Sequence, residues 1–230
     1  MSAKKIAACA VMTALLLAVQ FALSFVSGVE LVSVLLLCFC YTFGVYCGLL
    51  TATVFSLIRC LLFGFMPNVV ILYLIYYNLF ALIFGVLGKH RLPPWVCPVL
   101  LSLLAVTTGY FAFTGIPISI LYQRKVSIML WILFGILVAL IIFYIVLLCA
   151  NRSDKGKEIA GVTALAAFCT VLFTLLDDII SPLIMGYTFD TAIAYFYTGF
   201  LAMLPQTICV TLSVFLLFYP IRSLFSKIRI

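Results

Sequence analysis

The side chains best suited to chemistry in this sequence are two adjacent carboxylates, Asp177 and Asp178. They lie near the end of an apolar run over residues 160–180, which is long enough to cross a membrane. A charged side chain inside such a run costs at least ~2.5–3.5 kcal/mol, so it usually faces a cavity or a partner of opposite charge. Either one Asp is a salt-bridged packing residue and the other meets the lipid headgroups, or the pair forms one wall of a polar pocket.

Other polar side chains are expected at the same depth. By helical rise, Arg59 lies about 7–8 Å below the outer end of its predicted helix and Asp177 about 4–5 Å below the end of its own. Glu30 and Tyr187 belong to the same layer. Arg59 can offer a forked donor set to a carboxylate or phosphate, whereas Asp177 or Asp178 can accept from amines or hydroxyls. We therefore predict a substrate site open to the outside for a zwitterionic or mixed-polarity molecule. The alternative is that Arg59 and Asp177 only neutralise each other.

Aromatic and amide side chains follow in the predicted helix over residues 69–88. Tyrosines at a membrane surface usually anchor a helix there. Asn78, however, lies roughly 14 Å inside the outer boundary, which is too deep for an anchor. We expect Tyr73, Tyr76 or Tyr77 to stack on a ring of the ligand, and we assign Tyr73, Tyr77 and Asn78 to the substrate site.

The sequence contains no GxSxG, HExxH or GxxxxGK[ST] motif, its nine cysteines form no CxxC pair, and its one histidine has no ligand partner nearby. We therefore expect no metal, no cofactor and no enzymatic activity. Asp177 and Asp178 begin like an acidic prenyltransferase box, but Ser181 stands where a third carboxylate is required. A membrane-embedded lipid or prenyl transferase and a stand-alone secondary transporter are the alternatives to a binding protein.

Composition defines the class of protein that must position these side chains. Of 230 residues, 67% are hydrophobic and 8% charged, with a mean hydropathy of +1.39. Too few polar groups are present to cover a soluble domain, so the sequence predicts an all-α, polytopic membrane helix bundle forming one domain over residues 1–230. The net charge of +7 comes mainly from short loops, which is typical of membrane orientation rather than of nucleic-acid binding.

Eight membrane passes are expected, the lipid bilayer being the first partner of the chain. The predicted spans are residues 5–26, 31–45, 46–64, 69–88, 95–114, 126–150, 158–180 and 191–219. Residues 31–64 could form one helix or two, but two helices turning at residues 44–48 leave ten loop and terminal cations in the cytoplasm and two outside, as the positive-inside rule favours. Both termini are then cytoplasmic. The first run is expected to be a retained helix rather than a cleaved signal peptide.

A ridge of small residues lies on the first predicted helix, where alanines recur at every fourth position: Ala10, Ala14, Ala18 and Ala22. Small side chains at this spacing let another helix approach closely. The partner helix belongs either to this chain or to another protein.

Four stretches of the sequence resemble the substrate-binding S component of energy-coupling-factor (ECF) transporters: residues 28–33, 59–65, 72–78 and 192–220. The resemblance implies a binder of a vitamin or related micronutrient in a bacterial plasma membrane. It also implies two kinds of partner, a transmembrane coupling subunit and two cytoplasmic ATPases, with Ala10, Ala14 and Ala18 docking on the coupling subunit. The family usually has six spans, so residues 95–150 are expected to be an inserted helical pair.

Overall fold

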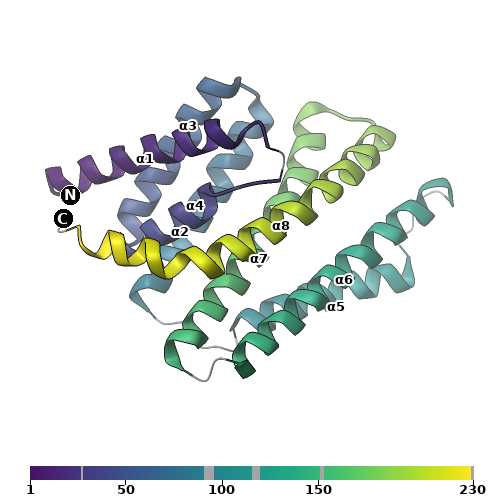
Figure 1. Cartoon of the computed structure of the whole chain (residues 1–230). Helices are drawn as coiled ribbons and strands as arrows, with labels where there is room; N and C mark the ends of the chain where they lie inside the picture. Colours follow the sequence, from purple (N-terminus) through teal and green to yellow (C-terminus); the bar gives the residue numbers. More distant parts are fainter. Residues whose placement is uncertain (27, 91–95, 116–119, 151–152, 229–230) are drawn as a thin grey trace.

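The structure is a computed structural model that describes residues 1–26, 28–90, 96–115, 120–150 and 153–228. These residues form eight α-helices and no strand (Figure 1). The helices are α1 (Ala3–Leu23), α2 (Val32–Phe43), α3 (Val45–Phe63), α4 (Pro67–Lys89), α5 (Val96–Thr114), α6 (Ile120–Ala150), α7 (Asp154–Met185) and α8 (Phe189–Ser226).

Six helices within the described ranges are long and apolar enough to cross a membrane, whereas α2 and the apolar part of α5 are shorter. The prediction of an all-α, polytopic membrane helix bundle is confirmed. The uncertain region over residues 31–64 forms two helices, because α2 ends at Phe43 and α3 begins at Val45. Gly44 between them has φ +84°, a left-handed conformation that glycine adopts without a steric penalty.

The short helix α2 follows an irregular segment that includes residues 28–31. Its 12 residues span about 18 Å, less than the ~30 Å of a bilayer core. Gly28, at φ +82°, packs so closely on Pro205 of α8 that an added Cβ would stand 2.9 Å from the proline Cβ. The backbone N–H of Glu30 donates to Cys209 Sγ at 3.3 Å. Non-helical backbone is tolerated at membrane depth where it is buried in protein or lines a cavity, and Gly28, Val29 and Glu30 line the cavity described below.

The two termini lie close together at one end of the bundle (Figure 1), and the basic residues Lys5 and Lys89 lie near the N-terminus. Met1, Lys5, Phe43 and Lys89 line one groove, and the Phe43 ring lies 6.1 Å from that of Phe225 near the C-terminus. Because the beginning of α1 and the ends of α2, α4 and α8 meet there, successive helices run in alternating directions. This end, which we call the lysine end, is the one predicted to be cytoplasmic.

A polar network also ties α2, α7 and α8 together at the lysine end. Arg222 pairs with Glu158 at 2.8 Å and lies over the Tyr41 ring at 4.7 Å. The Tyr41 hydroxyl donates to Glu158, and the Tyr219 hydroxyl donates to the Lys155 carbonyl at 2.7 Å. Because the Tyr219 hydroxyl also donates to Glu158 Oε2 at 3.2 Å, both oxygens of this carboxylate have partners.

Helices α5 and α6 form the helical pair predicted over residues 95–150. They lie side by side at the edge of the bundle and pack against α7 and α8 (Figure 1). The other six helices enclose most of the core, in which Phe55, Phe80, Phe84 and Phe218 are almost completely buried.

Candidate ligand-binding site

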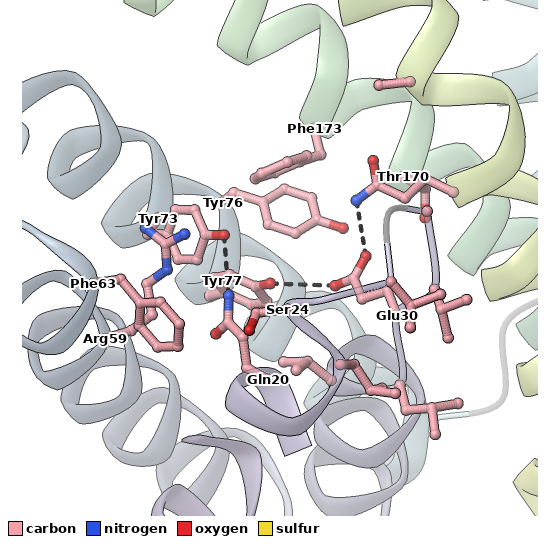
Figure 2. A pocket seen from close by; sticks show the side chains of 18 residues that line it. Gln20, Ser24, Glu30, Arg59, Phe63, Tyr73, Tyr76, Tyr77, Thr170 and Phe173 are labelled. Carbon is pink, nitrogen blue, oxygen red and sulfur yellow. Dashed lines mark hydrogen bonds between the residues drawn. The ribbon is translucent and has the colours of Figure 1, made fainter. Parts of the chain in front are cut away.

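A cavity of about 350 Å³ lies between six structural elements, on the side of the bundle away from the lysine end. Its walls come from the end of α1, the segment before α2, the end of α3, the first half of α4, and the middle of α7 and α8 (Figure 2). The polar and aromatic residues that line it are Gln20, Ser24, Glu30, Arg59, Phe63, Tyr73, Tyr76, Tyr77, Thr170, Phe173 and Gln206.

Arg59 brings a positive charge to one side of the cavity. Its guanidinium lies over the Tyr73 ring at 4.3 Å and beside the Phe63 ring at 5.4 Å, and such stacking holds the planar group in one orientation. Its Nε is buried and has no hydrogen-bond partner. The one ion pair within 4.0 Å among the described residues joins Arg222 and Glu158. The alternative that Arg59 and Asp177 neutralise each other is therefore wrong.

Glu30 brings a negative charge to the opposite side of the cavity (Figure 2). Its Oε1 accepts from the Ser33 hydroxyl at 2.9 Å and from the Tyr77 hydroxyl at 3.4 Å. Its Oε2 accepts from Gln206 Nε2 at 2.9 Å. Three neutral donors thus hold the carboxylate, which joins the segment before α2 to α4 and α8.

An aromatic wall connects the two charged sides. The Tyr76 and Phe173 rings lie 4.7 Å apart in a T-shaped arrangement, and Tyr73 lies 5.9 Å from Phe173 and 5.1 Å from Tyr77. Each ring restricts its neighbours, so the wall is a preformed apolar surface. Beside it, Gln20 donates to the Tyr73 hydroxyl at 3.5 Å, while its own Oε1 is buried without a partner.

The structure places four of the predicted site residues around this cavity: Glu30, Arg59, Tyr73 and Tyr77. Sequence reasoning did not assign Phe173, Thr170 or Gln206 to the site. A usable signal existed for Phe173, because it precedes Asp177 by four residues and therefore lies one turn deeper on α7.

Asp177 and Asp178 do not form a wall of the cavity. Asp177 accepts from the Ser181 hydroxyl at 2.6 Å and from the Tyr195 hydroxyl at 3.0 Å, in a separate cluster that Asn68 joins through Ser181. Asp178 is buried, and its Oδ1 has no partner. The expectation that these carboxylates face the same pocket as Arg59 is wrong, because α7 turns them toward α4 and α8 beyond the cavity.

Asn78 and Tyr187 also lie outside the cavity lining. Asn78 accepts from the Thr53 hydroxyl at 2.8 Å and donates to the Leu74 carbonyl at 2.8 Å, which ties α3 to α4. Tyr187 follows α7, and its ring lies 5.8 Å from that of Tyr195. Asn78 thus links α3 to α4, and Tyr187 packs against α8. The proposal that these two residues contact substrate has no geometric support.

The alanine ridge on α1 points away from the rest of the chain. Ala10, Ala14, Ala18 and Ala22 are all exposed, whereas Cys9, Met12, Thr13 and Leu16 on the same helix are buried. The alternative in which these alanines pack within the same chain is therefore wrong. The ridge is available to another molecule.

The chemistry available at the cavity is recognition by charge, hydrogen bonding and stacking. No three His, Cys, Asp or Glu side chains of the described part of the chain are grouped so as to hold a metal ion. Comparison with protein-family models, curated proteins and solved structures finds no match to this chain.

Proposed function

We propose that this protein is the substrate-binding S component of an ECF-type transporter and captures a vitamin or related micronutrient from outside. The proposal depends mainly on the cavity between Arg59 and Glu30, which lies on the side of the bundle away from the lysine end. The positive-inside rule assigns the lysine end to the cytoplasm of a bacterial cell, with both termini there. The cavity then belongs to the outer half of the membrane.

The apolar core below the cavity supports a role in capture rather than in conduction. Phe55, Phe80 and Phe84 are almost completely buried between the cavity and the lysine end. A channel or a self-sufficient transporter requires hydrated or polar groups along both access paths. These rings provide none, so release on the inner side requires a movement driven from elsewhere.

The exposed alanine ridge on α1 is the proposed docking surface for the coupling subunit. In lipid, helices associate largely through close packing, and methyl-sized side chains allow the closest approach. The sequence carries no P-loop, so the proposed energy source is ATP hydrolysis by two partner ATPases.

The test is co-purification with the coupling subunit and ATPases, followed by uptake in liposomes. Ala14→Leu should abolish co-purification and ATP-driven uptake, because the larger side chain keeps the partner helix away. Ala139→Leu is the matched control, since Ala139 is also exposed but lies on α6. Both variants should bind solute as the unchanged chain does. Accumulation of solute by the protein without partners would instead establish a stand-alone secondary transporter.

A further inference from the structure

The two charged groups of the cavity differ in how far they are satisfied within the protein. Glu30 accepts hydrogen bonds from Ser33, Tyr77 and Gln206. Arg59 has no carboxylate of the described residues within 4.0 Å, and its Nε is buried without a partner. The two groups lie on opposite sides of the cavity (Figure 2). The cavity therefore lacks a hydrogen-bond acceptor for Arg59.

The position of Arg59 suits a planar anion. Stacking on Tyr73 at 4.3 Å restrains the guanidinium, so little side-chain entropy remains to be lost on binding. The edge of the group carries five N–H donors in a fork, which match the paired oxygens of a carboxylate or phosphate. A half-buried cation without a counter-ion is costly, and an anionic ligand removes that cost.

The negative side of the cavity offers a cationic ligand less than Arg59 offers an anion. Both oxygens of Glu30 already accept hydrogen bonds from neutral donors, so an ammonium group would share the carboxylate with Ser33, Tyr77 and Gln206. Asp177 and Asp178 do not line the cavity. The Glu30 carboxylate is therefore already hydrogen-bonded within the protein, whereas the Arg59 guanidinium still lacks an acceptor at Nε.

The remaining surface of the cavity sets the shape of the ligand. Tyr76 and Phe173 form a preformed ring wall, their centroids 4.7 Å apart. A volume of about 350 Å³ has room for a molecule with one or two fused rings, since it equals that of roughly twelve water molecules at ~30 Å³ each. The unpartnered Oε1 of Gln20 can accept from a donor on such a ring.

We propose that the ligand is an anionic, flat small molecule whose carboxylate or phosphate binds Arg59 and whose ring packs on Tyr76 and Phe173. This inference rests on the proposed function in one respect only, that the cavity is the capture site. It names the class of ligand, and it does not depend on the identity of the partners.

The test uses the purified full-length chain in nanodiscs, without partner proteins. The probes share one ring system and differ in charge: 2-naphthoate, 2-naphthyl phosphate, 2-naphthamide and 2-naphthylmethylamine. The better of the two anions should bind at least about tenfold more tightly than the neutral amide, because charge-assisted hydrogen bonds exceed neutral ones by that margin. Which anion binds better distinguishes a carboxylate ligand from a phosphate ligand.

Two variants assign the preference to Arg59. Arg59→Gln should abolish the preference for anions, and Arg124→Gln, which removes an exposed charge at the start of α6, should preserve it. Thermal unfolding of each variant shows whether it is folded, and Arg59→Lys, which keeps the charge but loses the fork, provides a second comparison. Tighter binding of the amine, equal affinities for all four probes, or binding of none of them overturns the inference. If the chain prefers anions but shows no ATP-driven uptake together with the partner proteins, the proposed transporter is overturned and the inference about the ligand stands.

Discussion

Replacing Glu30 and Gln206 together is the sharpest test of how the cavity is built. Gln206 Nε2 donates to Glu30 Oε2 at 2.9 Å, and this bond joins the segment before α2 to the middle of α8. If the bond holds the segment in place, Glu30→Ala and Gln206→Ala should not have independent effects. A double-mutant cycle isolates their coupling.

The magnitude follows from the contacts. A hydrogen bond to a charged group contributes about 1.5–3 kcal/mol, and Glu30 accepts two bonds at 2.9 Å and a longer one at 3.4 Å. Because Glu30 is only half-buried, we take the lower end of the range, so Glu30→Ala should lower the free energy of unfolding by about 3 kcal/mol. In a chain of this size that corresponds to a Tm lower by about 6–12 °C.

The coupling between the two replacements should be about 1.5 kcal/mol, because either one alone already breaks their shared bond. The assay is equilibrium unfolding in mixed micelles for the unchanged chain, both single variants and the double variant. A second cycle combines Glu30→Ala with Arg222→Ala, which lies at the lysine end, and its effects should add to within about 0.5 kcal/mol.

Additive effects of Glu30→Ala and Gln206→Ala would refute the reasoning. The bond would then be absent in the membrane, and Glu30 would be free to contact a ligand. The inferred preference of the cavity for anions would then depend on the unpartnered Arg59 alone.

The remaining predictions concern packing, the acidic pair and orientation. Gly88→Ala should destabilise the chain by about 1–3 kcal/mol, because the new Cβ would overlap a backbone carbonyl oxygen of α2; Gly135→Ala, which meets no atom within 4 Å, should instead stabilise α6 slightly. Asp178→Asn should raise stability by about 1 kcal/mol, since it removes a buried charge without a partner, and a loss of 2-naphthoate binding in this variant would place Asp178 in the site after all. In intact cells, a membrane-impermeant maleimide should label Arg124→Cys and not Lys89→Cys, and the reverse pattern would contradict the proposed orientation.

Much of the architecture could be predicted from the sequence because it depends on composition and on single residues. Long apolar runs determine membrane helices, since only a helix satisfies its own backbone in lipid. Gly44 marked the turn between α2 and α3, and the cations of the loops grouped Lys5 and Lys89 at one end. Depth along the helices placed Arg59 and Glu30 in one layer, and both line the cavity.

The depth of a residue follows from its position along one helix. The direction in which its side chain points depends on how all the helices pack together. Tyr77 and Asn78 are adjacent in sequence and about 100° apart around α4, yet Tyr77 lines the cavity whereas Asn78 bonds to Thr53 of α3. On α7, Phe173 lines the cavity, and Asp177, one turn further out, faces Ser181 and Tyr195.

The sequence by itself thus determined the class of protein and the helices, together with the position of each polar group along its helix. The tertiary structure decided which of those groups meet. The physical reason is that these helices are apolar on all sides, so no amphipathic face indicates how each is rotated. Rotation is set by close packing between helices, such as that of Gly88 of α4 on the backbone of α2. In the packed bundle Arg59 lines the cavity and Asp177 does not.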